Sequence, residues 1–98
     1  MSGRAAREGP PTRLRVRVRG AVQGVGFRPF VYGLARRLAL SGHVLNDSEG
    51  VLAEVEGARG ADFLAALRRE APPLSRIDAI EVETLRAEGA RGFEIRES

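Results

Sequence analysis

The sequence predicts an α+β fold in which an antiparallel sheet carries two helices on one face. Three observations support this prediction. The chain has 98 residues, which is the size of one domain. It contains a segment in which apolar and charged side chains alternate strictly. Its expected elements follow in the order strand, helix, strand, strand, helix, strand, strand, for which this arrangement is the compact solution.

The first expected element is a strand that begins near Thr12. Residues 1–11 contain charges, Gly and Pro without periodicity, and we expect a flexible tail there and an ordered domain over 12–98. In residues 13–19 arginine alternates with leucine or valine, which is the pattern of a half-buried strand. The side chains expected to face the core are Leu14, Val16 and Val18.

A glycine-rich loop over residues 20–26 and a helix come next. Pro29 suits the first turn of this helix, because the amide hydrogen that proline lacks would have no partner there. Gly42 suits the end of the helix. Apolar residues recur at the three- and four-residue spacing of one helical face, at Phe30, Val31, Leu34, Ala35 and Leu38.

The second half of the chain predicts a hairpin, a helix and two further strands. The turn of the hairpin contains Asp, Ser, Glu and Gly, which tolerate tight turns. Two consecutive prolines end the second helix. The expected ranges are 43–46 and 51–56 for the hairpin strands, 61–70 for the helix, and 77–85 and 93–96 for the last two strands.

The composition excludes several kinds of chemistry. All 16 basic residues are arginine, so no lysine can act as an amine nucleophile. The absence of cysteine rules out a disulfide, a thiolate metal site and a thiol nucleophile. His43 is the single histidine, and we interpret it as a strand residue rather than a metal ligand. We therefore expect no metal and no cofactor. With no secretory signal and no apolar run long enough to cross a bilayer, we expect a cytoplasmic location and no membrane partner.

Four arginines on one face of the first strand suggest a nucleic-acid surface, since arginine commonly neutralises phosphates. The neighbouring strands favour a different interpretation. Their alternation places four glutamates on the same face, so we expect a charge-balanced surface and no nucleic-acid partner. The residues concerned are Arg13, Arg15, Arg17 and Arg19, with Glu54, Glu56, Glu81 and Glu83.

The loop at residues 20–26 is a candidate anion site. It leads into a helix start, where backbone N–H groups lack partners and the helix dipole is positive. Arg28 lies in the first turn, where a cation opposes the dipole at a cost of about 0.5 kcal/mol. A phosphate bound between them would remove this conflict; alternatively, Arg28 merely caps a surface or pairs with an acid. The loop lacks the Gly-Lys-Ser/Thr ending of a nucleotide-binding P-loop.

Asn46 stands at the end of the strand before the hairpin turn. Turn formation is the commoner role of asparagine at such a place, and its amide can instead hold a water molecule.

Three motifs together resemble the acylphosphatase family. They are the Gly-x-Val-Gln-Gly-Val-x-Phe-Arg loop at 20–28, the Gly-x-Val-x-Asn strand end at 42–46, and the Gly-Val pair at 50–51 that opens the next strand. The resemblance covers about residues 12–97 and implies a ferredoxin-like α/β sandwich with βαββαβ order. The segments 26–32 and 72–78 look most like the first domain of large carbamoyltransferases that act in [NiFe] hydrogenase maturation.

The resemblance also implies a function and its residues. The substrate is an acyl phosphate, here carbamoyl phosphate, and the catalytic residues are Arg28 and Asn46. Arg28 binds the phosphate, and Asn46 positions the attacking water. The backbone expected to share the phosphate with Arg28 belongs to Gly20, Ala21, Val22, Gln23, Gly24, Val25 and Gly26. An acyl phosphate is already activated, so holding it and orienting water requires no metal or cofactor.

Asp47 departs from the pattern of stand-alone acylphosphatases, which usually have Thr or Ser after the catalytic Asn. Its negative charge near an anion site is expected to weaken phosphate binding or to make it depend on a neighbouring domain. Two functions follow as alternatives. One is hydrolysis of carbamoyl phosphate, and the other is a non-catalytic phosphate-binding or docking role with downstream domains of a larger carbamoyltransferase.

Overall fold

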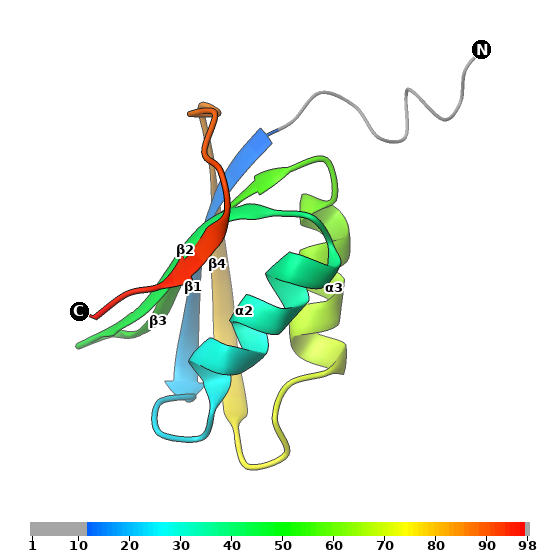
Figure 1. The fold of residues 1–98 in the computed structure, drawn as a ribbon. Helices are drawn as coiled ribbons and strands as arrows, with labels where there is room; N and C mark the ends of the chain where they lie inside the picture. The colour runs from blue at the N-terminus through cyan, green and yellow to red at the C-terminus, as the bar shows by residue number, and fades with distance from the viewer. Residues whose placement is uncertain (1–11, 98) are drawn as a thin grey trace.

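The computed structural model of the chain describes residues 12–97, and the expected tail at 1–11 lies outside them. Five strands form one sheet, and both helices pack on the same face of it (Figure 1). The elements are β1 Thr12–Ala21, α2 Phe27–Arg37, β2 Ser41–Asp47, β3 Gly50–Gly57, α3 Gly60–Arg69, β4 Arg76–Leu85 and β5 Phe93–Ile95. The predicted element order and fold class are confirmed.

The sheet has the strand order β4-β1-β3-β2-β5, so the first strand lies inside it. β1 pairs antiparallel with both β3 and β4, and β2 pairs antiparallel with β3. β5 differs from the prediction of an antiparallel sheet, because it runs parallel to β2 at the edge. The sheet is therefore mixed, with a four-stranded antiparallel part and one short parallel strand.

The register of β1 against β3 separates apolar from charged side chains. Val16 lies opposite Ala53 and Val18 opposite Val51, and all four are buried beneath the helices. Directly opposed residues of an antiparallel pair share a face, so these pairs belong to the core. The helices add their own buried residues, which are Phe27, Val31, Leu34 and Ala35 from α2 and Phe63, Ala66 and Leu67 from α3.

The prediction that Gly42 ends the first helix is wrong. The helix ends at Arg37, Leu38 follows as its cap, and Ala39 takes a positive φ of 57°. Gly42 instead lies in β2 with φ 134°, where a β-carbon would overlap the carbonyl oxygen of Glu54. The glycine is needed because two strands approach each other closely, and sequence spacing alone cannot distinguish that role from a helix stop.

We predict opposite effects for two Gly→Ala substitutions. Gly42→Ala should destabilise the fold by about 2–4 kcal/mol, through overlap with Glu54 and an unfavourable φ. Gly33 lies on the exposed side of α2 with open space around it, so Gly33→Ala should stabilise by about 0.5–1 kcal/mol. Urea unfolding of both variants provides the test. Equal effects of the two substitutions would contradict our account of Gly42.

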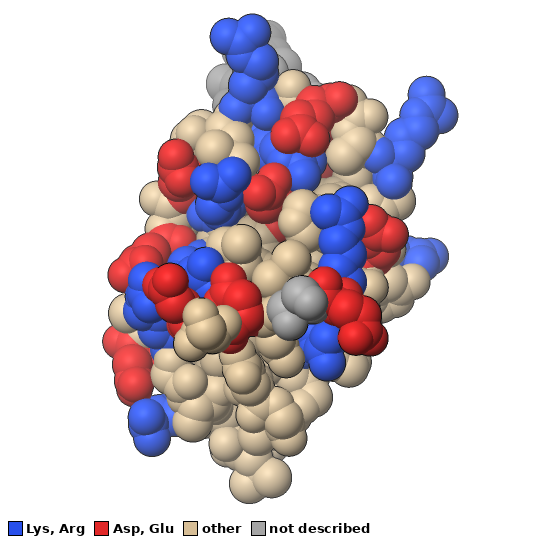
Figure 2. Space-filling view, turned by 90° about the vertical axis from the view of Figure 1, so that its left-hand side faces the viewer, with Lys and Arg blue, Asp and Glu red and all other residues tan. Residues whose placement is uncertain are grey.

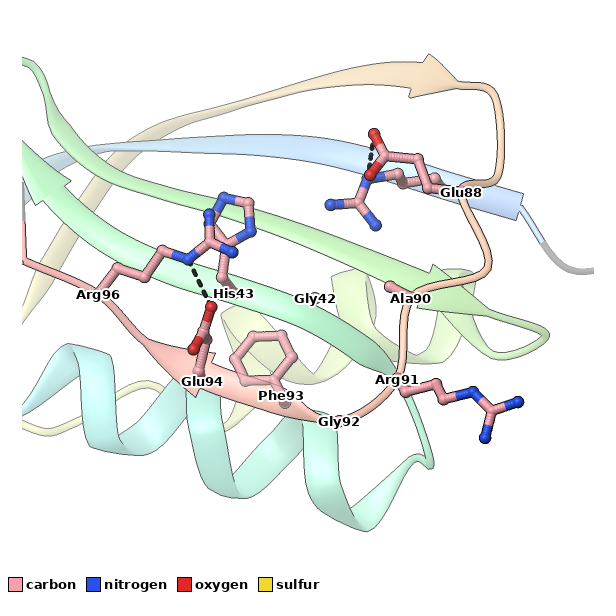
Figure 3. A pocket seen from close by; sticks show the side chains of 10 residues that line it. Gly42, His43, Glu88, Ala90, Arg91, Gly92, Phe93, Glu94 and Arg96 are labelled. Atoms are coloured by element: carbon pink, nitrogen blue, oxygen red, sulfur yellow. Dashed lines mark hydrogen bonds and ion pairs between the residues drawn. The ribbon is translucent and has the colours of Figure 1, made fainter.

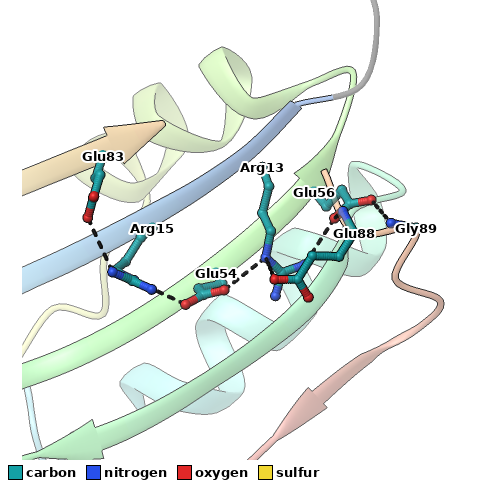
Figure 4. A network of polar contacts seen from close by, with 7 residues as sticks. All are labelled: Arg13, Arg15, Glu54, Glu56, Glu83, Glu88 and Gly89. Carbon is teal, nitrogen blue, oxygen red and sulfur yellow. Dashed lines mark hydrogen bonds and ion pairs between the residues drawn. The ribbon is translucent and has the colours of Figure 1, made fainter. Parts of the chain in front are cut away.

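The outer face of the sheet is covered by ion pairs. Arginines and carboxylates are interspersed rather than gathered by sign in the side view (Figure 2). Arg13 is at the centre of the most buried group, with only 4% of its side chain exposed (Figure 4). Its Nε donates to Glu54 at 2.8 Å, and its Nη1 donates to Glu56 at 3.0 Å. Arg15 joins Glu54 to Glu83, which extends the network across three strands.

The predicted pairing of β1 arginines with strand glutamates is thus confirmed for Arg13, Arg15 and Arg19, the last of which donates to Glu81 at 3.0 Å. Arg17 is the exception. It reaches across β3 and pairs with Asp47 at the end of β2.

Paired glutamates have lowered pKa values in this network. Burial acts to raise the pKa of Glu54, but hydrogen bonds from Arg13 and Arg15 outweigh it and hold that pKa below 4.5. The pKa of Glu56 is lowered mainly by the backbone N–H of Glu88 and further by Arg13. A carboxylate whose pKa is lower in the folded state contributes stability above its unfolded pKa and loses it as the pH falls.

We therefore predict that acidification destabilises the native chain more than the variant Arg13→Met. Without Arg13 the two glutamates have higher folded-state pKa values, so less stability remains to be lost below pH 4.5. The test is urea unfolding at neutral pH and at about pH 4. Arg68→Met, on the exposed side of α3, should keep the native pH dependence. An unchanged pH dependence in Arg13→Met would show that Arg13 does not set these pKa values.

Candidate functional site

Three chain segments meet at one end of the sheet. β1 ends there, β3 begins there, and β2 arrives at the turn that joins it to β3. The backbones are close together, because a β-carbon on Gly50 would overlap the carbonyl oxygen of Val18. The predicted glycine loop leaves β1 at this end and leads into α2. The topology thus brings the loop and the end of β2 together.

The loop between β1 and α2 has a backbone suited to anions. Gly24 has φ 77° and Gly26 has φ 79°, both in the left-handed region, whereas Val25 between them does not have a positive φ. Alternation of this kind turns successive N–H groups toward one side. A β-carbon on either glycine would meet no heavy atom within 4 Å, so the backbone here is open to an approaching ligand. Val22, by contrast, is fully buried and anchors the loop to the core.

The start of α2 leaves its N–H groups available. Gly26 is the cap residue, no side chain caps the helix, and the first turn has no acidic residue. The positive end of the helix dipole is therefore not compensated by a carboxylate of its own first turn.

Arg28 lies in this first turn and is half-buried. Its Nη1 donates to the carbonyl oxygen of Arg96 at 3.4 Å, which is a long and weak hydrogen bond. The ion pairs found among residues 12–97 include no pair between Arg28 and a carboxylate. These contacts do not support the alternative in which Arg28 pairs with an acid, whereas the bond to the Arg96 carbonyl is compatible with the alternative in which Arg28 caps a surface.

Asn46 is the penultimate residue of β2, opposite Val51 of β3. Since Val51 is a core residue, the Asn46 side chain lies on the helix-covered face of the sheet, the side on which Arg28 also lies. Its Oδ1 is buried and accepts no hydrogen bond from residues 12–97. The backbone N–H of Arg96 donates to the carbonyl oxygen of Val44 in β2. Arg96, whose carbonyl oxygen Arg28 contacts, is therefore bound to a β2 residue only two positions before Asn46. A buried acceptor of this kind has a strong tendency to bind a donor such as water.

The charge of Asp47 is compensated on the opposite face. Its Oδ1 accepts from Nη1 of Arg17 and from the backbone N–H of Glu49 at 2.9 Å. The Arg17 guanidinium, followed by the Glu49 N–H, lowers the pKa of Asp47, so this residue stays ionised. Arg17 thus compensates the charge of Asp47 on the face of the sheet opposite Asn46, and the expected effect of Asp47 on phosphate binding stays a prediction.

Gln23 has a role that sequence reasoning missed, since only its backbone was expected to contribute. Its Nε2 donates to the carbonyl oxygens of Asp47 at 2.5 Å and Gly50 at 2.9 Å. The loop is thereby joined to both sides of the β2–β3 turn. A polar side chain between apolar and glycine residues was the available signal, but its partners are 24 and 27 residues away.

Two hollows of about 330 Å³ lie at opposite ends of the sheet, so size does not identify the site. One is formed by the loop and the β2–β3 turn, through residues 20–23 and 48–50. The other lies between β2, β5 and the segment before β5, and the residues that line it include His43, Arg91 and Arg96 (Figure 3). There the Arg96 side chain is paired with Glu94, because its Nε donates to Oε2 of Glu94 at 2.6 Å. Burial and Arg96 lower the pKa of His43, which lies in β2 as predicted.

No group of three or more potential metal ligands occurs in the part of the chain that the structure describes. Over the same residues, neither helix has the length and apolar character needed to cross a membrane.

The sequence profile of the acylphosphatase family matches residues 14–95. The carbamoyltransferase HypF of Rhizobium leguminosarum bv. viciae is 62% identical over 91 residues, which cover 93% of this chain and 12% of that protein. The acylphosphatase of Rubrobacter xylanophilus is 48% identical over 87 residues, covering 86% of this chain and 79% of that enzyme.

A solved structure of full-length HypF, in a phosphate- and nucleotide-bound form, superposes with a TM-score of 0.86. It is 35% identical and covers 90% of this chain, which corresponds to 12% of that protein. The chain therefore spans about an eighth of the carbamoyltransferases that it matches, and most of the length of the acylphosphatase.

Proposed function

The chain belongs to the acylphosphatase family, and on that premise we propose that it hydrolyses an acyl phosphate, with carbamoyl phosphate as the preferred substrate. The observation that carries the proposal is the position of the Asn46 Oδ1. This atom is buried without a protein donor among the described residues, on the same side of the sheet and at the same end as Arg28 and the loop.

In the proposed reaction, the phosphate lies between Arg28 and the loop. The guanidinium contacts phosphate oxygens, and N–H groups at the start of α2 and in the left-handed segment around Gly24 and Gly26 contact others. Arg28 is free to do so because its present contact to the Arg96 carbonyl is long. These donors stabilise the charge that the phosphoryl oxygens carry as the transition state forms.

Asn46 orients the attacking water in this proposal. Its Oδ1 accepts a hydrogen bond from the water, whose oxygen then faces the phosphorus atom. A bond forms between the water oxygen and phosphorus, and the bond between phosphorus and the acyl oxygen breaks. The products are inorganic phosphate and the carboxylate or carbamate, with one proton released to solvent. Positioning and electrostatic stabilisation suffice for a substrate with such a good leaving group.

The preference for carbamoyl phosphate rests on the similarity to HypF carbamoyltransferases, which is 62% identity for the protein from Rhizobium leguminosarum bv. viciae. On this basis we extend the proposal to a role in [NiFe] hydrogenase maturation, in the cytoplasm, together with downstream domains of a larger carbamoyltransferase.

A second candidate function is a phosphate-binding or docking module without hydrolysis. The chain matches only 12% of the carbamoyltransferase from Rhizobium leguminosarum bv. viciae, which favours this second candidate. A domain of that size can bind a substrate that other domains of the same protein then convert. Both candidates use the same phosphate contacts, and only turnover separates them.

We predict chelator-resistant release of phosphate from carbamoyl phosphate, measured beside acetyl phosphate and corrected for spontaneous breakdown. Arg28→Gln and Asn46→Ala should each lower turnover by about 10²–10³-fold, because each removes a group that acts on the transition state. Arg36→Gln is the matched control, since Arg36 is an exposed arginine of the same helix. Its turnover should equal that of the native chain.

The outcome of these assays separates the two candidates. Full turnover in a folded Arg28→Gln variant would contradict the proposed site. No turnover by the native chain, combined with a phosphate-dependent rise in melting temperature that Arg28→Gln loses, would favour the docking module.

A further inference from the structure

We propose that Asp47 is a positioning residue for Asn46, held from one side by Arg17 and from the other by Gln23. The inference rests on the proposed function, in which Asn46 orients the attacking water. It assigns a role to the negative charge of Asp47, which the sequence alone suggests to be unfavourable near an anion site.

The first part of the evidence is the path that Arg17 takes. Arg17 lies on β1 opposite Glu81 of β4 and Leu52 of β3. It leaves the nearby carboxylate of Glu81 to Arg19 and instead reaches across β3 to Asp47 on β2. The Arg17 side chain is 18% exposed and the Asp47 side chain 30%, so this is a partly buried ion pair. Such a pair restrains both groups more than a solvent-exposed one does.

The second part is the turn itself. The same Oδ1 of Asp47 accepts the backbone N–H of Glu49, which is the hydrogen bond of an Asx turn. Arg17 therefore fixes the turn as well as the side chain. Because Asp47 is the direct neighbour of Asn46 and faces the other side of the sheet, fixing it fixes the backbone from which the Asn46 side chain projects.

The third part is the bond to the loop. An amide NH₂ group has two donors, and Gln23 uses Nε2 toward Asp47 and Gly50, the residues on either side of the turn. The loop that would hold the phosphate and the strand end that would hold the water are thus joined through the backbone of Asp47. This joint sets the distance between the two halves of the proposed site.

Turnover is expected to depend on this arrangement more than substrate binding does. Arg28 and the loop N–H groups bind the phosphate without Asp47, whereas the direction of the water depends on Asn46. A displacement of about 1 Å at a reacting group can reduce the rate about 10²-fold. The positioning role therefore predicts a lower kcat with a largely unchanged KM when Asp47 is truncated.

The test uses the variants Asp47→Ala, Asp47→Asn and Arg17→Met. Asp47→Ala and Arg17→Met should lower kcat for carbamoyl phosphate about 10- to 100-fold, with KM within about 3-fold of the native value. Asp47→Asn keeps an Oδ1 acceptor for Arg17 and the Glu49 N–H, and should retain kcat within about 3-fold. The variant that combines Arg17→Met with Asp47→Ala should be no slower than either single variant, since both substitutions remove one interaction. Glu83→Ala removes another carboxylate of the outer face and should change neither constant.

A second measurement does not require turnover. The side-chain amide of Asn46, observed by ¹⁵N NMR relaxation, should be rigid in the native chain and in Asp47→Asn, and mobile in Asp47→Ala and Arg17→Met. If the native chain releases no phosphate but the amide follows this pattern, the proposed hydrolysis fails and the positioning role stands. Equal rigidity in all four proteins would overturn the positioning role. A rise in kcat/KM in Asp47→Ala would also overturn it, because Asp47 would then act only by repelling the substrate.

Discussion

The pairing of β1 with β3 is the constraint on which the other features depend. Its register puts Val16 and Val18 beneath the helices and turns the arginines outward, where the carboxylates of the flanking strands meet them. The same register brings the end of β1 to the start of β3, and so the glycine loop to the hairpin turn. A slip of one residue would exchange the two faces and expose the valines while burying arginines. Burial of the core and assembly of the proposed site are therefore consequences of one pairing.

Much of the fold could be predicted from the sequence because its signals are local. Alternation identifies β1, helical spacing identifies α2, and the residues that join β2 to β3 identify a turn. The prediction for Gly42 is wrong because the role of this residue depends on the Glu54 carbonyl of another strand, which no local pattern indicates. The parallel direction of β5 was missed for a similar reason, since three residues carry too little pattern to define a partner.

The candidate site was predictable to a different degree. The loop, Arg28 and Asn46 could be singled out because a glycine-rich loop before a helix has a recognisable chemistry and because the motifs resemble a family. The parts that connect them could not. The bonds of Gln23 to the turn and of Arg17 to Asp47 join residues 24 to 30 positions apart, and they exist only once the register of three strands is set. The charge of Asp47, which the sequence alone suggests to be unfavourable, is thus compensated by Arg17 two strands away.

The bond between Arg28 and the Arg96 carbonyl bears on the order in which the protein is built. Its two residues are 68 positions apart, and the strand that carries one of them to its place, β5, joins the sheet only through β2. The four antiparallel strands and both helices are complete in sequence by residue 85, whereas the Arg28 contact waits for residue 96. On the ribosome, most of the core can therefore form before the surroundings of Arg28 are finished, and β5, which adds Phe93 to the core, is the last strand of this sheet to emerge.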